Sequence, residues 1–277
     1  MTIARKPSIT PAGLPGFWEK LHAARRSFLA LDYDGTLAPF TVERMEARVL
    51  PGTIELMEKI RDRTGGSLCV VSGRPVSEVL ALLGDLKIML VGSHGHEFRY
   101  PYGSLIERQP TPRQAEGLEM AREYCIARDL DMHIERKVAS IALHTRGLPP
   151  QDALRMEADA ASSWSRIAGA HGLALRRFNG GLELRCTGMD KGNALLILLS
   201  LLPGDTFPVY IGDDDTDEDA FLAIRGRGVG IKVGDPGRHT SARGALPDIP
   251  SVQAFLMGWL QHAPEGLWEE VAWNQEG

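Results

Sequence analysis

The sequence predicts a doubly wound, Rossmann-like α/β fold with a parallel sheet, interrupted by an inserted α+β module. Four nearly continuous apolar runs indicate strands buried on both faces, at residues 27–34, 67–75, 87–95 and 207–217. Helical segments alternate with the first three strands. Polar groups follow three of the four runs, at the edge where open α/β sheets bind their ligands.

Two helices are expected between the first three strands. Residues 51–66 form the first helix, with Pro51 suited to a first helical turn and Gly65 to the position after a helix end. Residues 77–83 indicate a shorter second helix. Alternation of strand and helix in this way is typical of a doubly wound sheet.

The middle of the chain has a different pattern and predicts a separate module. Helices are expected at 114–128 and 152–169, and strands at 131–135, 139–146, 173–178 and 181–185. The last two strands would turn at Asn179–Gly180. We therefore expect a core of residues 1–105 and 188–277, with an α/β module of residues 106–187 inserted into it.

The composition is that of an ordinary globular protein, with 277 residues, of which 43% are hydrophobic and 24% charged. A net charge of −5 gives no general attraction to nucleic acid or to an anionic membrane, so neither is expected as a partner. Local cations would have to hold any anionic ligand. The sequence leaves the oligomeric state open, and we expect a monomer.

Three cysteines, Cys69, Cys125 and Cys186, are too scattered for a disulfide framework or a zinc site. They suit buried apolar positions in a reducing compartment. No apolar stretch follows the cations near the N-terminus, so no signal peptide is expected. The longest apolar run, residues 194–202, is too short to span a bilayer. These observations favour a cytoplasmic protein.

The sharpest motif is LDYDGT, which places two carboxylates at the end of the first strand. Asp32 could act as a nucleophile toward phosphorus. Asp34 could protonate a leaving oxygen and then activate water. Gly35 permits a tight turn, and the hydroxyl of Thr36 could position the acid. An ordinary strand-ending turn at Asp-Gly is the alternative interpretation.

Two further motifs offer groups that suit a phosphate. The Ser72 hydroxyl and the backbone amides of VVSGRP could hold a phosphate oxygen, while Arg74 adds charge or anchors the loop. Lys191 opens a helix, a position that the helix dipole disfavours for a cation. An anionic partner would explain that position, and a solvated lysine is the alternative.

A run of acids, GDDDTDE, follows the fourth strand. Its five carboxylates repel one another unless a cation or a helix N-terminus compensates them. Magnesium prefers one or two carboxylates together with phosphate oxygens and water, and Asp213 at the strand end could supply one. Asp217 could instead act as a first-turn acid of the next helix.

In this order the four motifs resemble those of phosphatases of the haloacid dehalogenase superfamily, over residues 28 to about 255. The resemblance implies a hydrolase core with an inserted α/β cap that governs substrate specificity. It implies that Asp32 is the phosphoryl-accepting nucleophile and Asp34 the general acid/base. Ser72 and Lys191 would then hold the phosphate.

The same resemblance implies a bound Mg²⁺ ion. Asp32, the backbone of Asp34 and Asp213 would be its ligands, with Asp214 and Asp217 binding it directly or through water. His94 and His96 also form an H-x-H pair, but no metal is expected there because only Glu97 is nearby to complete a set.

Within the superfamily, the cap region is similar to that of the trehalose-6-phosphate phosphatase family. The similarity rests on GSHGHEF, IERKVASIALHTR, LELRCTGMDKG and GDDDTDEDAF. It implies a Mg²⁺-dependent phosphoric monoester hydrolase of trehalose biosynthesis that forms an aspartyl-phosphate. Residues expected to contact the sugar phosphate are Arg74, His94, Glu97, Glu135, Lys137 and Glu183.

Three positions depart from the pattern of that family: Val138, Thr145 and Cys186. Since they lie in the predicted cap, they leave the identity of the sugar open. A phosphatase of sucrose phosphate or of mannosylglycerate phosphate is the alternative within the same chemistry. A phosphomutase and a non-catalytic regulator that binds a sugar phosphate are the alternatives outside it.

Overall fold

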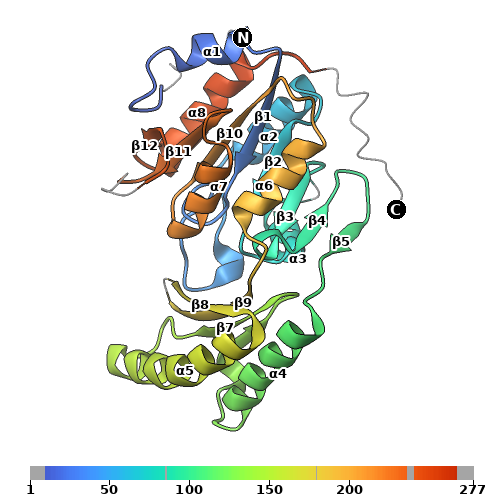
Figure 1. The fold of residues 1–277 in the computed structure, drawn as a ribbon. Coiled ribbons are helices and arrows are strands. Elements are labelled where there is room, and N and C mark those ends of the chain that lie inside the picture. Colours follow the sequence, from blue (N-terminus) through green and yellow to red (C-terminus); the bar gives the residue numbers. More distant parts are fainter. Residues whose placement is uncertain (1–9, 85, 179, 236–239, 267–277) are drawn as a thin grey trace. The chain divides into compact units, whose positions relative to one another are not determined.

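The computed structural model describes residues 10–84, 86–178, 180–235 and 240–266, and divides the chain into two compact units (Figure 1). The first unit combines Met1–Leu105 with Asp190–Gly277, and the second is Ile106–Met189. A mainly parallel sheet between two layers of helices forms the first unit, and an antiparallel sheet with two helices forms the second. The predicted fold class is thus confirmed.

The sheet of the first unit has the strand order β12-β11-β10-β1-β2-β3-β4-β5. Strands β12 to β3 in this order are parallel, and β4 is antiparallel to β3. The strands are β1 (Arg26–Leu31), β2 (Leu68–Val71), β3 (Met89–Gly92), β4 (Glu97–Arg99), β5 (Leu105–Glu107), β10 (Thr206–Gly212), β11 (Val229–Val233) and β12 (Gly244–Leu246). The boundary between the units falls within β5.

Helices pack on both faces of this sheet. One face is covered by α1 (Phe17–Ala23), α2 (Thr53–Arg63), α3 (Val76–Leu83) and α8 (Ile249–His262). The other face is covered by α6 (Lys191–Ser200) and α7 (Glu218–Ala223). No helix in the described part of the chain has the length and apolar character needed to cross a membrane.

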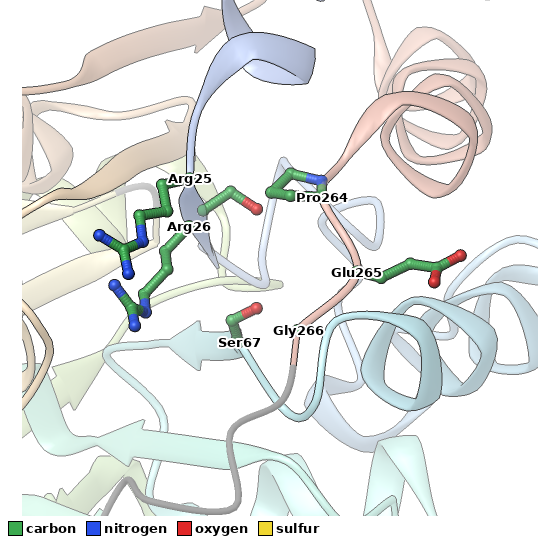
Figure 2. A pocket seen from close by; sticks show the side chains of 7 residues that line it. Arg25, Arg26, Ser67, Pro264, Glu265 and Gly266 are labelled. Carbon is green, nitrogen blue, oxygen red and sulfur yellow. The ribbon is translucent and has the colours of Figure 1, made fainter.

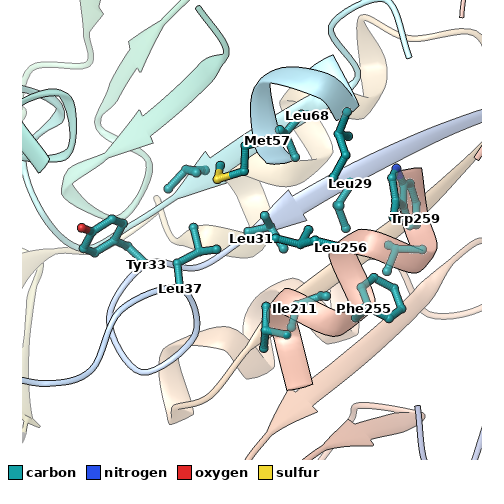
Figure 3. Packing of buried hydrophobic residues seen from close by; sticks show 14 of the residues in the cluster. Leu29, Leu31, Tyr33, Leu37, Met57, Leu68, Ile211, Phe255, Leu256 and Trp259 are labelled. Carbon is teal, nitrogen blue, oxygen red and sulfur yellow. The ribbon is translucent and has the colours of Figure 1, made fainter. Parts of the chain in front are cut away.

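Burial on both faces explains the continuous apolar runs that predicted the strands. In β1, Leu29 and Leu31 pack toward α8, against Leu256 and Trp259 among others (Figure 3). The intervening residues of β1 belong to the cluster on the opposite face. Each large side chain buried in this way stabilises the unit by about 1.5–3 kcal/mol.

The second unit has the strand order β6-β7-β9-β8, with all pairs antiparallel. Its elements are α4 (Pro112–Ile126), β6 (Ile134–Arg136), β7 (Ser140–His144), α5 (Pro150–His171), β8 (Leu173–Phe178) and β9 (Gly181–Cys186). A capping box formed by Thr111 and Gln114 begins α4. Both helices pack on the same apolar face of the sheet, which leaves the other face without a helix from this unit.

The strand expected over residues 131–135 is present and pairs with β7, but it begins three residues later than predicted. Residues Asp131–His133 form a 3-10 turn, and the strand is Ile134–Arg136. The chain reverses at Asp129, which has a φ of 54°, and the amide of His133 then donates to the carbonyl of Leu130. At these residues, local hydrogen bonds therefore take the place of the hydrogen bonds that would pair a strand with its neighbour. Asn179, at the predicted hairpin turn, lies outside the described residues.

Candidate active site

The acids predicted from two distant motifs meet at the carboxyl edge of the sheet. Strands β1 and β10 are paired in register, with Leu31 opposite Ile211, so both strands end at the same level. The amide of Asp32 extends this pairing by donating to the carbonyl of Ile211 at 2.8 Å. Asp32 and Asp213 therefore follow neighbouring strand ends.

Gly35 is needed at the turn after Asp32 for two separate reasons. Its φ of 79° lies in the left-handed region that favours glycine. A Cβ atom on Gly35 would also lie 2.1 Å from Oδ2 of Asp213, where no atom fits. Next to it, the hydroxyl of Thr36 donates to Oδ1 of Asp213 at 3.4 Å, so Thr36 contacts a different acid from the one expected.

The contacts of Lys191 explain why α6 begins with a lysine. Its Nζ atom lies 2.8 Å from Oδ1 of Asp32 and 2.8 Å from Oδ1 of Asp217, and its side chain is only 3% exposed. The cap of the helix is supplied separately by Asp190, which accepts from the amide of Asn193 at 2.7 Å. The alternative of a solvated lysine is therefore wrong.

Asp217 is fully buried and accepts four hydrogen bonds. Besides the ammonium of Lys191, the Tyr210 hydroxyl donates to Oδ1 at 2.6 Å. The amides of Asp213 and Asp214 donate to Oδ2 at 2.9 and 3.0 Å. Since a carboxylate has about four acceptor sites, these bonds occupy Asp217 fully. Asp217 thus fixes the backbone that carries Asp213.

Crowding of carboxylates shifts the pKa values in this cluster. Burial, followed by the charge of Asp217, raises the pKa of Asp32 well above its ordinary value. The same two causes raise the pKa of Asp213 to about 7. Burial would by itself lower the pKa of Lys191, but the charges of Asp217 and Asp32 raise it well above its usual range. A single ammonium faces more negative charge than it can offset.

The donor set suits a hard divalent cation. Asp32, Asp213 and Asp217 offer carboxylate oxygens that lie within 4.8 Å of one another. Oxygen ligands and uncompensated negative charge are what Mg²⁺ requires. Because Asp217 already accepts four hydrogen bonds, Asp32 and Asp213 are the better ligands. The side chain of Asp214 accepts from the amide and hydroxyl of Thr216 at 2.8 and 2.7 Å, which caps the following turn.

Ser72 and Arg74 follow β2 and lie beside the turn after β1. The Oγ atom of Ser72 is buried and accepts from the amide of Arg74 at 3.1 Å. The guanidinium of Arg74 donates to both carboxylate oxygens of Asp34, at 2.6 and 2.7 Å. A third bond, 3.1 Å long, joins Arg74 to Glu78. Its predicted contact with a substrate stays a prediction.

His94, in the turn after β3, and Glu97, the first residue of β4, are both predicted to contact substrate. His94 has a φ of 53°, and its amide donates to the carbonyl of Ser72 at 3.1 Å. Glu97 is buried, and its Oε2 atom accepts from the Ser93 hydroxyl at 2.6 Å and from the amide of Val76 at 3.1 Å. These bonds give Glu97 a structural task, namely joining this turn to the start of α3.

Glu135, Lys137 and Glu183 come together within the second unit. Register places Glu135 and Glu183 on either side of Ala142, on the sheet face opposite α4 and α5. Lys137 Nζ lies 3.0 Å from Oε1 of Glu183, and its side chain is only 9% exposed. The alternative of an exposed charge pair formed by Glu135 and Lys137 is therefore wrong.

Sequence reasoning missed three polar residues on the same face. Ser140 donates to Oε1 of Glu183 at 2.8 Å, and His144 Nε2 lies 2.8 Å from Oε2 of Glu135. Arg185 is buried opposite Ser140 in the register. Alternation of polar residues with the apolar residues of β7 and β9 is the signal that could have identified them.

A pocket elsewhere in the first unit is not part of this site. It has a volume of about 180 Å³ and lies at the amino ends of β1 and β2 (Figure 2). Its lining consists of Arg25, Arg26, Ser27, Ser67, Pro264, Glu265 and Gly266. The acids follow the carboxyl ends of the strands, so the pocket and the acids lie at opposite ends of the sheet.

Comparisons with known proteins place the chain in a family. A family model described as trehalose-phosphatase matches residues 30–248. Trehalose-phosphate phosphatase B of Arabidopsis thaliana is 31% identical over 269 residues, an alignment that covers 89% of this chain and 70% of the relative. Trehalose-phosphate phosphatase of Mycobacterium tuberculosis is 30% identical over 258 residues, covering 87% and 64%.

Solved structures share the fold. A crystal structure titled as a trehalose-6-phosphate phosphatase related protein has a TM-score of 0.67 at 25% identity, covering 85% of this chain and 97% of the other. The C-terminal domain of trehalose-6-phosphate phosphatase from C. albicans has a TM-score of 0.73 at 20% identity, covering 93% and 100%. Since the family model spans most of its length, the chain belongs to the trehalose-phosphatase family, whose members are phosphoric monoester hydrolases.

Proposed function

We propose that the chain is a Mg²⁺-dependent phosphatase that hydrolyses trehalose 6-phosphate to trehalose and phosphate. One observation supports the chemistry above all: Lys191 bridges Asp32 and Asp217 directly beside Asp213. A nucleophile, a cation and carboxylates for a metal are thereby combined in one buried cluster. The relatives named as trehalose-phosphate phosphatases support the choice of substrate.

In the first step, Asp32 attacks phosphorus. The bond from an Asp32 carboxylate oxygen to phosphorus forms as the bond from phosphorus to the sugar oxygen breaks. Asp34 gives its proton to the departing sugar oxygen and is left as a carboxylate. Ser72 and Lys191 hold the phosphoryl group, so that positioning and neutralisation of charge supply most of the acceleration.

In the second step, water releases the phosphate. Asp34 accepts a proton from the water as the water oxygen bonds to phosphorus. The bond between phosphorus and Asp32 breaks, and both carboxyl groups return to their starting protonation states. The ammonium of Lys191, already 2.8 Å from Asp32, stabilises the carboxylate that leaves.

The fit of the donor set to Mg²⁺ supports a metal requirement. Asp32 and Asp213 would hold the ion, with the backbone carbonyl of Asp34 as a further ligand. Asp217 would support these ligands by accepting from the amides of Asp213 and Asp214. Asp214 would support them by capping the turn that follows. When bound, the ion neutralises charge on the phosphoryl oxygens.

Selection of the sugar is assigned to the second unit. Glu135, Lys137 and Glu183 lie on the sheet face opposite α4 and α5, where Ser140 and His144 hold the two carboxylates in place. Carboxylates and an ammonium form charge-assisted hydrogen bonds with hydroxyls. A site of this kind discriminates against analogues that lack those hydroxyls, because its polar groups would then be unpaired.

The experiment that tests this function is phosphate release from a panel of sugar phosphates, with Mg²⁺ and with EDTA. We expect trehalose 6-phosphate to have the highest kcat/KM, and EDTA to abolish release. Faster release from sucrose phosphate or mannosylglycerate phosphate would replace the substrate. Transfer of phosphate within the sugar would indicate a mutase, and binding without phosphate release a regulator.

A further inference from the structure

The guanidinium of Arg74 forms a bidentate pair with the carboxylate of Asp34. Its Nε atom donates to Oδ2 at 2.6 Å and a terminal nitrogen donates to Oδ1 at 2.7 Å. Such a fork fixes the plane of a carboxylate as well as its position. It is made to the ionised form of Asp34, which is the form that accepts a proton from water in the second step. When Asp34 carries the proton of the first step, one oxygen is the donor and the other still accepts from Arg74. Among the described residues, Arg74 is the only one with a side-chain hydrogen bond to Asp34, whose side chain is 25% exposed. Loss of Arg74 would therefore remove both hydrogen bonds that orient this carboxylate.

Arg74 is itself held on several sides. Glu78, in the first turn of α3, accepts from it at 3.1 Å, and Arg44 donates to Glu78 at 2.8 Å. The guanidinium carbon also lies 5.6 Å from the centre of the Tyr33 ring. The side chain is only 7% exposed. These contacts form a chain of alternating charge from Asp34 through Arg74 and Glu78 to Arg44.

We infer that Arg74 is a positioning residue that orients Asp34 for proton transfer, and that it does not serve as a phosphate contact. Its donors are directed at Asp34 and Glu78, and neither residue is a phosphate ligand in the proposed chemistry. This inference rests on the proposed function, because only there does Asp34 move a proton. It assigns Arg74 a different task from Ser72 two residues earlier.

If Arg74 acts through Asp34, the effect of losing Arg74 on the rate of phosphoryl transfer should depend on the leaving group. A sugar alkoxide needs a proton as it departs, and general acid–base catalysis contributes about 10²–10⁴-fold. A p-nitrophenolate group leaves without one. Loss of Arg74 should therefore slow transfer of phosphate from trehalose 6-phosphate to Asp32, while transfer from p-nitrophenyl phosphate stays fast. Release of phosphate from Asp32 should slow with both substrates, since Asp34 must accept a proton from water.

The test compares Arg74→Lys and Arg74→Ala with the wild type on both substrates. For trehalose 6-phosphate we expect kcat to fall about 100-fold with KM within about threefold. For p-nitrophenyl phosphate we expect a retained burst of p-nitrophenolate followed by slow turnover. A raised KM with kcat preserved would show that Arg74 binds phosphate and would overturn the inference. Arg122→Ala, which breaks an exposed pair in the second unit, is the matched control.

Two further variants separate positioning from folding. Glu78→Gln keeps Arg74 but removes one of its supports, so the same pattern should follow with a smaller fall in kcat. In the Asp34→Asn background, Arg74→Ala should cause no additional loss in steady-state turnover of p-nitrophenyl phosphate. An additive loss would mean that Arg74 acts elsewhere. If the wild type released no phosphate from either substrate, the proposed function itself would fail.

Discussion

Lys191 and Asp32 form a buried ion pair, with 2.8 Å between Nζ and Oδ1 and side chains only 3% and 6% exposed. Strand β1 carries the carboxylate and the first residue of α6 carries the ammonium, so the pair joins segments separated by the whole second unit in sequence. Buried charges are tolerated only when they are paired. This pair connects the chemistry of the site to the stability of the first unit.

Replacing Lys191 by Met should destabilise the fold as well as abolish activity. Asp32 and Asp217 would lose the ammonium and remain buried beside Asp213. Breaking a buried pair typically lowers the free energy of unfolding by about 3–5 kcal/mol. Urea unfolding of the metal-free variant measures this, with Lys59→Met on the exposed side of α2 as the control. A variant as stable as the control would contradict the account.

Gly35→Ala and Gly52→Ala form a matched pair of glycine substitutions. Both glycines have a positive φ, at 79° and 83°, and an alanine there is strained by about 1–2 kcal/mol. Only at Gly35 would the new Cβ strike a carboxylate, that of Asp213, because Gly52 has open space around it. We expect Gly35→Ala to lower kcat/KM and the affinity for Mg²⁺ at least about tenfold. Equal effects of the two variants would show that contact between the new Cβ and the Asp213 carboxylate does not matter.

Stability of the metal-free protein should fall as pH rises. Burial and the charge of Asp217 raise the pKa of Asp213 from 3.8 to about 7, so the folded state binds more protons than the unfolded state between those values. The free energy of unfolding therefore decreases with pH across that window. Urea unfolding in EDTA measures the trend, and its difference from that of Asp213→Asn isolates this group. Mg²⁺ should reduce the decrease, and a rise in stability for wild type relative to the variant would contradict the prediction.

Glu135→Ala should affect the sugar more than the chemistry. Glu135 lies on the sheet face opposite α4 and α5 with His144 against it, and it has no role in the proposed phosphoryl transfer. We expect kcat/KM to fall roughly 100-fold for trehalose 6-phosphate, as when a site loses hydrogen bonds to hydroxyls, with little change for p-nitrophenyl phosphate. Arg136→Ala, on the opposite face of the same strand, is the control. Equal losses on both substrates would count against sugar recognition by this face.

The sequence was sufficient to predict the central strands and the acids that follow them. Strands buried on both faces are continuous apolar runs, and the polar residue that ends such a run marks the sheet edge. Weaker elements were not predicted, including β11, β12 and β4. These have three to five residues each, and such short runs look the same in strands and in loops.

The partners of the charged side chains could not be predicted. Arg74 and Asp34 are 40 residues apart, and their pairing depends on β2 lying beside β1 in a particular register. Asp217 was ambiguous for a similar reason. Whether it caps a helix or accepts four hydrogen bonds depends on the 3-10 turn Asp215–Asp217, which directs its carboxylate back toward β10. Spacing along the chain does not determine either geometry.

Chemical trapping on Asp32 would detect the proposed aspartyl-phosphate itself. Borohydride reduces an acyl phosphate to an alcohol, so treatment during turnover of trehalose 6-phosphate with Mg²⁺ should convert Asp32 to homoserine, detectable by mass spectrometry of the peptide. Asp32→Asn should be folded, inactive and unmodified, whereas Asp215→Asn, in the exposed part of the acidic run, should behave as wild type. Phosphate release with no modification at Asp32, or near-normal turnover by Asp32→Asn, would contradict the account.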